Sequence, residues 1–146
     1  MGMISSVRKF FRRKPLVVVI RLDGVIGAVS RFGSGGLDDS NTQKLLEKAF
    51  EFEKAKAIAI KINSPGGSPT QSSLIASRIL KLSEEKKIPV LCFCEDVAAS
   101  GGYWLACAGE EIYSDINSII GSIGVISASF GFSELISRYG IERRVY

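Results

Sequence analysis

Three short apolar runs constrain the fold of this chain more than any other feature. The runs lie at residues 16–20, 57–62 and 90–94, and β-branched residues dominate the first. Continuous apolar runs of this length are typical of strands that are buried on both faces of a sheet. Because helical patterns separate the runs, the connections favour right-handed crossovers. The sequence therefore predicts an α/β fold with a mainly parallel sheet.

Turn and capping residues place the helices between these strands. Capping residues at 38–40 precede an apolar stripe with helical spacing. Ser68, followed by a proline, opens the next helix, which we expect to end near 86–87. A short helix should cover 100–109. Shorter elements are expected beyond it, with strands at 111–114, 123–127 and 141–146 and a helix at 133–139.

The positive charge of the chain is concentrated at its start. Residues 1–22 hold six basic and no acidic side chains, whereas the rest carries 13 basic and 15 acidic ones. A basic arm without a basic folded face gives no reason to expect a nucleic-acid partner. We expect a flexible arm at 1–14 and one domain at 15–146, since this length buries a sizeable core without disulfides or metals.

The role of the basic arm is left open by the sequence. A solvated tail, a mitochondrial targeting segment and a contact with an anionic membrane surface all fit its composition. The longest apolar run nearby, at 16–20, is far shorter than the roughly 20 residues of a membrane span. We therefore predict no transmembrane segment and a cytoplasmic or membrane-peripheral location, with mitochondrial targeting as an alternative.

The chain contains no histidine. This excludes Ser-His-Asp and Cys-His catalysis and histidine-ligated metals, and it leaves lysine, carboxylates, hydroxyls, thiols and backbone dipoles to carry any chemistry.

The three cysteines, Cys92, Cys94 and Cys107, are an odd number in apolar surroundings without metal-ligand spacing. We interpret them as small buried residues in a reducing compartment rather than as a disulfide framework. No cofactor and no metal are expected.

Two strand-to-helix junctions, at 63–68 and 97–102, are the candidate sites for chemistry. Both lie at the carboxyl ends of predicted parallel strands, where ligand sites collect, and so they are expected to face each other. The Ser-Pro-Gly-Gly stretch of the first offers unobstructed backbone N–H groups, although it also fits an ordinary tight turn. Ser100 in the second lies between alanines and glycines, where it fits either a reactive hydroxyl or a helix-capping serine.

Three motifs in register carry a resemblance to a known family. They are Ile-Asn-Ser-Pro-Gly-Gly at 62–67, Asp-Val-Ala-Ala-Ser-Gly-Gly-Tyr at 96–103 and Gly-Ser-Ile-Gly-Val at 121–125. In order and spacing they resemble the signal peptide peptidase A family of serine proteases, peptidase family S49, which includes protease IV and SohB-like members. The resemblance covers residues 16–146, and three motifs together are far more specific than one glycine pattern.

The resemblance implies a ClpP/crotonase-like fold, a spiral of β-β-α units, and peptide-bond hydrolysis by a Ser-Lys dyad. Ser100 matches the nucleophile of the family. Gly66 or Gly67, together with Gly101, match the positions whose backbone N–H groups form the oxyanion hole. Ser122 matches a hydroxyl that helps to orient the lysine. Family members assemble into rings with sites between subunits, so the resemblance also implies a homo-oligomer.

The lysine base of the dyad has no counterpart in this sequence. The last lysine is Lys87, and the basic residues after it are Arg138, Arg143 and Arg144, which effectively never deprotonate. We interpret Lys61 as an outward charge at a strand end and do not nominate it. We therefore expect a domain that is incomplete at its C-terminus and ends before the lysine, with a catalytically silent homologue as the alternative.

Three functions remain open from the sequence. The first is a serine endopeptidase for extended peptides, such as signal-peptide remnants in or near membranes. Its substrate strand would pair with the edge at 64–68, and its small apolar pockets would lie near the alanines beside Ser100. The second is a silent peptide-binding or assembly module. The third and weakest is a crotonase-type acyl-CoA enzyme, because Glu95 and Asp96 fit a solvated strand end better than a catalytic pair.

Overall fold

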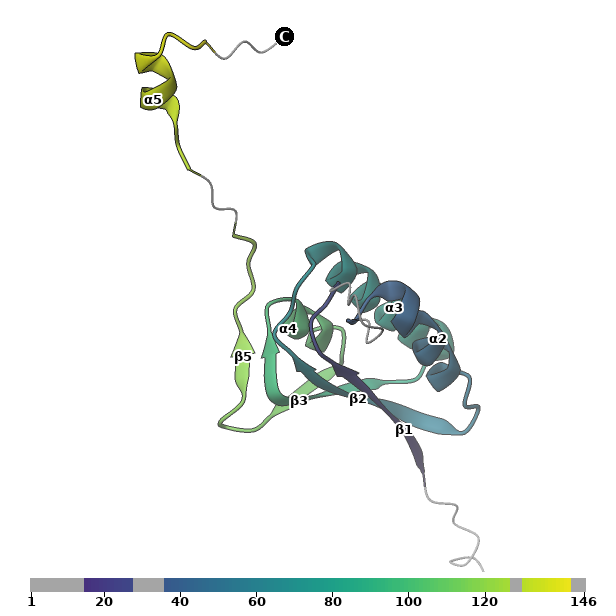
Figure 1. Cartoon of the computed structure of the whole chain (residues 1–146). Helices are drawn as coiled ribbons and strands as arrows, with labels where there is room; N and C mark the ends of the chain where they lie inside the picture. The colour runs from purple at the N-terminus through teal and green to yellow at the C-terminus, as the bar shows by residue number, and fades with distance from the viewer. Residues whose placement is uncertain (1–14, 28–35, 127–129, 143–146) are drawn as a thin grey trace, which may run out of the picture.

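The computed structural model describes residues 15–27, 36–126 and 130–142 (Figure 1). The predicted basic arm at 1–14 and most of the predicted strand at 141–146 lie outside these residues. Within them, the chain alternates between strands and helices. The elements are β1 (Leu16–Asp23), α2 (Asp39–Phe50), β2 (Ala55–Ser64), α3 (Pro69–Lys86), β3 (Val90–Ala99), α4 (Gly101–Ala106), β4 (Glu111–Ser114), β5 (Ile119–Gly121) and α5 (Ser133–Arg138).

The five described strands form one sheet in which all pairs are parallel. The strand order is β1-β2-β3-β4, and β5 also pairs with β3, beyond the point where β4 ends. The predicted α/β fold with a mainly parallel sheet is confirmed. Because the strands are parallel, the carboxyl ends of β2, β3 and β5 lie at the same end of the sheet, and the two glycine-rich junctions begin there.

Helices α2, α3 and α4 pack on one face of the sheet (Figure 1). The fully buried residues of this face alternate along the strands, as Leu22, Ile60 and Cys92 illustrate. The prediction that the first strand is buried on both faces is wrong, because Val17 and Val19 of β1 are 44% and 60% exposed. β1 is an edge strand, and no described element covers its second face.

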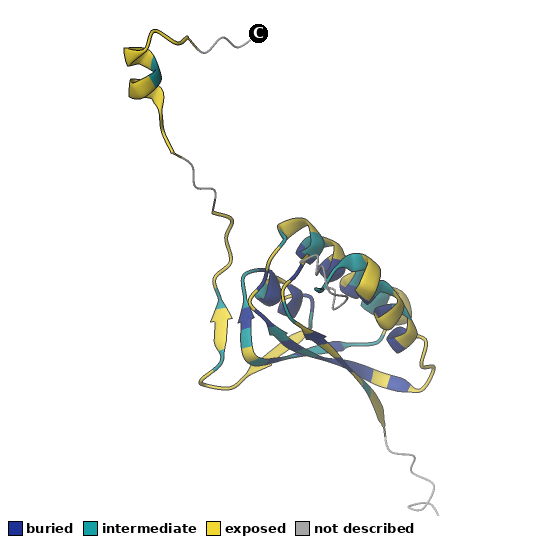
Figure 2. Cartoon of the chain, in the orientation of Figure 1, coloured by how far each residue is buried: buried dark blue, intermediate teal, exposed yellow. Residues whose placement is uncertain are grey.

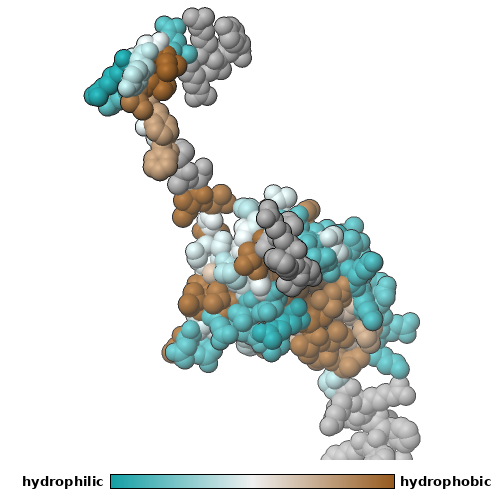
Figure 3. All heavy atoms as spheres, viewed as in Figure 1, coloured by the Kyte–Doolittle hydropathy of each residue, from teal (hydrophilic) through white to brown (hydrophobic). Residues whose placement is uncertain are grey.

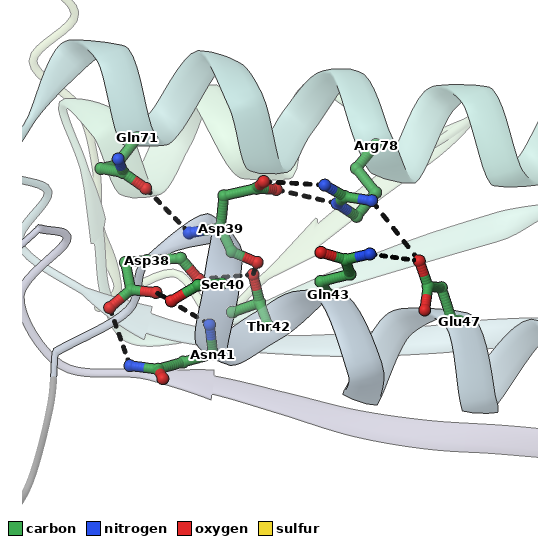
Figure 4. A network of polar contacts seen from close by, with 9 residues as sticks. All are labelled: Asp38, Asp39, Ser40, Asn41, Thr42, Gln43, Glu47, Gln71 and Arg78. Atoms are coloured by element: carbon green, nitrogen blue, oxygen red, sulfur yellow. Dashed lines mark hydrogen bonds and ion pairs between the residues drawn. The ribbon is translucent and has the colours of Figure 1, made fainter.

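The predicted helix starts at 38–40 and at Ser68 are confirmed. The Asp38 carboxylate caps α2 by accepting from the Asn41 N–H at 2.8 Å, and Ser68 caps α3, which has proline at its first position. A polar network joins the two helices (Figure 4). Arg78 of α3 donates two hydrogen bonds to the Asp39 carboxylate of α2, at 2.8 and 2.7 Å.

Several expected boundaries are corrected by the structure. β3 continues through Glu95 and Asp96 to Ala99, because a shift in its register with β2 lets the pairing resume after a bulge. A strand is present at Ile119–Gly121 instead of 123–127, whose residues 123–126 form no regular element. The predicted helix near the C-terminus is confirmed as α5, which has no buried residue.

The described residues after β5, at 122–126 and 130–142, lead away from the helices and sheet, and their exposed surface is largely apolar (Figures 2 and 3). Ile126, Phe130 and Tyr139 are 94%, 86% and 76% exposed. In the described ranges, no helix combines the length and apolar character that a membrane crossing requires.

The three cysteines differ in their surroundings. Cys92 and Cys94 are buried on the helix-covered face of β3, as expected, but Cys107 at the C-terminal cap of α4 is exposed. All three are free thiols. Burial raises the pKa of Cys92 to about 12. The buried pair therefore consists of neutral thiols at physiological pH.

Candidate active site

The two glycine-rich junctions meet at the end of the sheet, as the sequence predicted. Gly66 lies directly against the start of α4, since a Cβ placed on it would be 2.7 Å from the Gly101 nitrogen and 2.8 Å from the Ser100 Cβ. Gly66 also has φ of +93°, which favours glycine. The close approach of the two backbones therefore depends on the absence of a side chain at this position.

Ser100 holds an unusual backbone conformation between β3 and α4. Its φ and ψ are 53° and −121°, in a region that non-glycine residues rarely adopt. Its N–H donates to the Gly121 carbonyl at 2.7 Å, and its side chain makes no capping hydrogen bond to α4. Ser100 therefore occupies the N-cap position of α4, but its hydroxyl does not cap the helix. The sharp turn presents the hydroxyl at the helix start instead of folding it back onto the helix.

Two backbone N–H groups beside Ser100 are free to bind a ligand oxygen. Gly67 and Gly101 donate no hydrogen bond to any acceptor within the described parts of the chain. The Gly66 N–H differs, because it donates to the Ser64 hydroxyl at 3.1 Å. Of the two alternatives at this turn, Gly67 therefore has the available donor in this structure, and Gly66 does not. Two available N–H groups that line one pocket are suited to an oxyanion.

A pocket of about 90 Å³ opens beside the Ser100 hydroxyl. Trp104 lines this pocket because it lies one helical turn after Ser100. The spacing of four residues is the sequence signal that could have predicted Trp104 as a pocket residue. The sequence predicted a pocket near the alanines beside Ser100, and this pocket does adjoin Ser100, although neither Ala98 nor Ala99 is among its lining residues. The pocket is lined by Gly67, Pro69, Ser100, Gly101, Trp104, Ile123, Gly124 and Val125.

Ser122 lies at the matching position of the neighbouring strand. Ala99 of β3 pairs with Gly121 of β5, so Ser100 and Ser122 each follow a member of the same pair. Ser122 also has a positive φ, of 54°, and it is exposed. The structure thus brings the third motif beside the second.

The edge at 64–68 is already occupied, contrary to the expectation of a free strand edge. Ile26 donates its N–H to the Gly66 carbonyl, and its own carbonyl accepts from the Ser68 N–H, both at 2.8 Å. This bridge also explains Gly67, because a Cβ there would clash with the Ile26 carbonyl. What remains open for pairing at this edge is the Gly67 N–H on the pocket side.

Charged residues of β1, β2 and β3 form an ion-paired group near this end of the sheet. Glu95 contacts Lys61 and also Arg21, the latter at 2.9 Å. The hydrogen bond from Lys61 and the charge of Arg21 lower the pKa of Glu95. The interpretation of Lys61 as an outward charge is confirmed, since it is half-exposed and paired. Within the described residues, no lysine lines the pocket beside Ser100.

Residues 83–146 match the family model described as Peptidase family S49. The chain is also 36% identical to the chloroplastic serine protease SPPA of Arabidopsis thaliana over 131 residues, which are 87% of this chain and 19% of that protein. It is 32% identical to Protease 4 of Haemophilus influenzae over 86% of this chain and 20% of that protein. This chain belongs to peptidase family S49.

The S49 chain is also similar to a curated protein that carries a different name. It is 51% identical over 139 residues to a protein of Brucella melitensis named Na(+)/H(+) antiporter NhaA, a match that covers 95% of this chain and 19% of that protein. The chain thus spans about one fifth of the length of these relatives, and the antiporter likeness concerns that one segment.

Among solved structures, the S49 chain resembles a mutant of the 1510-N membrane-bound stomatin-specific protease. The TM-score is 0.60 at 21% identity, and the match covers 87% of this chain and 60% of that one. Likeness at this identity shows the fold alone. It confirms the ClpP/crotonase-like class that the three motifs implied.

Proposed function

We propose that this S49 chain carries the nucleophile and the oxyanion site of a serine endopeptidase that works through a Ser-Lys dyad. The observation that carries the proposal is the conformation of Ser100, whose hydroxyl makes no helix cap and lies beside the free N–H groups of Gly67 and Gly101. The family membership supports peptide-bond hydrolysis as the reaction. The base lysine would come from residues outside these 146 or from a second chain.

The proposed reaction uses the geometry at the two junctions. The Ser100 oxygen attacks the scissile carbonyl, the C=O π bond opens, and the N–H groups of Gly67 and Gly101 hold the resulting oxyanion. A neutral lysine amine accepts the serine proton. As the carbonyl re-forms and the C–N bond breaks, the lysine passes that proton to the leaving amine. Water then hydrolyses the acyl-enzyme. A lysine can hold a neutral amine where burial lowers its pKa. The role proposed for Ser122 is to orient that amine with its hydroxyl, and the pairing of Ala99 with Gly121, the residues before Ser100 and Ser122, supports it.

The pocket favours an extended peptide with an apolar side chain at the residue before the cleaved bond. Trp104, Ile123 and Val125 supply apolar walls, and a volume of about 90 Å³ suits a small side chain. Signal-peptide remnants and other membrane-associated peptides have this chemistry. The exposure of Ile123 and Val125, at 64% and 77%, supports a homo-oligomer in which a second chain encloses the pocket.

Labelling with a fluorophosphonate probe tests the nucleophile. The comparison uses the chain as it stands, a version extended by the next ~20 residues of its gene, a length typical of one further element and its connection, and Ser100→Ala in each. We expect labelling that requires Ser100 and that rises at least tenfold in the extended version if the extension supplies a lysine. Equal labelling of the Ser100→Ala variant would refute the assignment of Ser100.

A catalytically silent homologue is the second candidate, favoured by the absence of a lysine among the described residues that line the pocket. A silent homologue differs from an active peptidase in one measurable respect. A silent homologue would bind an apolar peptide at the pocket, so that Trp104 fluorescence changes on titration, yet no version of the chain would cleave that peptide. Cleavage that depends on Ser100 excludes it.

A further inference from the structure

The buried Ser64 hydroxyl has no role in the proposed reaction, yet Ser64 contacts both glycine-rich junctions, the first through its hydroxyl and the second through its carbonyl oxygen and Cβ. Ser64 is the last residue of β2, its relative exposure is 0%, and it pairs with Ala98 of β3. A Cβ on Gly102 would be 2.5 Å from the Ser64 carbonyl oxygen and 3.1 Å from its Cβ. Ser64 therefore lies directly beneath α4.

The hydroxyl satisfies a backbone group that is otherwise buried. Its oxygen accepts the N–H of Gly66 at 3.1 Å, and Gly66 is itself buried. Strand pairing supplies no alternative acceptor for this N–H among the described residues. An unpaired buried N–H is unfavourable, so removing the hydroxyl favours rotation of the turn until the group finds water.

The next peptide group connects this contact to the oxyanion site. The Gly66 carbonyl accepts from Ile26, and in a trans peptide the carbonyl and the following N–H point in opposite directions. The Gly67 N–H is thereby directed away from Ile26. Gly67 lines the pocket together with Ser100, and its N–H has no acceptor among the described residues. Two hydrogen bonds fix the orientation of the Gly66–Gly67 turn: the Gly66 N–H donates to the Ser64 hydroxyl, and the Gly66 carbonyl accepts from the Ile26 N–H.

We infer that Ser64 is a positioning residue, whose hydroxyl holds the Gly67 N–H in the direction needed to bind an oxyanion. The effect of Ser64 on oxyanion binding rests on the proposed function, whereas the hydrogen bond between Gly66 and Ser64 does not depend on it. Ser64 touches no substrate in this arrangement and acts through Gly66.

A matched control is available in Ser72 of α3. It is as fully buried as Ser64 and it also lies beneath a glycine of α4, since a Cβ on Gly101 would clash with its hydroxyl. Its hydroxyl, however, donates to the Ser68 carbonyl one turn earlier in its own helix, at 2.9 Å. Ser72→Ala therefore removes a buried hydroxyl of the same size without freeing an N–H of the turn.

The experiment measures the affinity of a peptide boronic acid, which forms an O–B bond to a serine hydroxyl, releases the hydroxyl proton to buffer, and places an oxygen in the oxyanion site. We expect Ser64→Ala to weaken this affinity at least tenfold, and to change the affinity for the matching unreactive peptide less than twofold. Ser72→Ala should change both less than twofold. Ser64→Cys keeps the shape of the side chain but has a weaker acceptor, so its affinity for the boronic acid should fall about threefold. This variant replaces Ser64→Ala in the experiment if the alanine variant does not fold.

Amide exchange of Gly66, followed by NMR in the 146-residue chain, separates this inference from the proposed function. We expect exchange at least tenfold faster in Ser64→Ala than in Ser72→Ala. If the wild-type chain and Ser100→Ala bind the boronic acid equally, the proposed nucleophile is wrong, and the exchange rates alone decide the role of Ser64. Equal exchange in the two alanine variants, or equal loss of boronic acid affinity, overturns the inference.

Discussion

At the scale of single residues, the site depends on positions where a side chain would be too large. Gly66, Gly67 and Gly102 all lie within contact of a neighbouring backbone, so each lets two chain segments approach more closely than alanine would. Ser100 and Ser122 add positive φ values without being glycine. Such conformations persist only where surrounding contacts enforce them, and here β3, β5 and α4 do so.

Gly102 gives a prediction in which two effects oppose each other. Alanine favours a helix over glycine by about 1 kcal/mol, so Gly102→Ala in α4 would stabilise the chain by propensity alone. Its Cβ, however, would be 2.5 Å from the Ser64 carbonyl oxygen, and overpacking of this kind costs about 1–3 kcal/mol. We therefore expect a net loss of stability, measured as a lower midpoint of urea unfolding with an unchanged slope.

Gly131→Ala is the control for that measurement. A Cβ at Gly131 meets no atom within 4 Å, so we expect its free energy of unfolding to change by less than about 0.5 kcal/mol. A midpoint that rises in Gly102→Ala would show that helix propensity outweighs the contact with Ser64.

At the scale of elements, the ion pair between α2 and α3 gives a prediction with a pH dependence. The hydrogen bonds from Arg78 lower the pKa of Asp39 in the folded chain. The contribution of the pair is therefore complete above the unfolded pKa of about 3.9, and it is lost as the pH falls through the folded value. Asp39→Asn should lower the free energy of unfolding by about 1 kcal/mol at pH 7, and by less near pH 3.

Glu85→Gln supplies the matched control. Glu85 pairs with Lys81 within α3 at 3.8 Å, and both side chains are more than half exposed. Chemical denaturation of both variants at pH 7 and pH 3 should show a pH-dependent loss for Asp39→Asn and almost none for Glu85→Gln. Equal losses in the two variants would contradict a special role for the bidentate pair.

Elements could be predicted from the sequence where local chemistry decides them. Asp38 and Ser68 mark two helix starts because capping depends on neighbours in the chain. The exposed face of β1 could not be predicted, because which strand lies at the edge is set by the whole sheet. The continuation of β3 past Glu95 could not be predicted either, because it depends on contacts with another strand. The Asn63 side chain of β2 accepts the Val97 N–H at 3.2 Å where the register shifts.

The site shows the same division between local and distant causes. The three motifs identified Ser100, both glycine turns and Ser122, since each motif is a continuous stretch of sequence. They left open which of Gly66 and Gly67 has the free N–H. That answer depends on Ser64 and on Ile26, and Ile26 lies some forty residues earlier in the chain. Pairings across such separations leave no local pattern to read.

At the scale of the whole molecule, one core joins the helices to the sheet. It runs from Ile20 of β1 to Leu105 of α4, and it includes the thiol of Cys92. The residues of this core are buried together, so we expect them to become accessible together in a single cooperative unfolding transition.

The three thiols report on that transition without any substitution in the core. Cys107 is exposed, whereas Cys92 and Cys94 are buried, and burial raises the pKa of both buried thiols, that of Cys92 to about 12. Since the thiolate is the reactive form, an aromatic disulfide reagent at pH 8 should modify one thiol per native chain within the mixing time and three in denaturant.

The two slow thiols should react together, at a rate that rises with urea in proportion to the unfolded fraction. Cys107→Ser should remove the fast phase and leave the slow phase unchanged. A fast phase of two thiols in the native chain would mean that β3 opens locally, away from α4, without unfolding of the rest. In that case the strand that presents Ser100 would be less firmly held than the burial of its helix-covered face indicates.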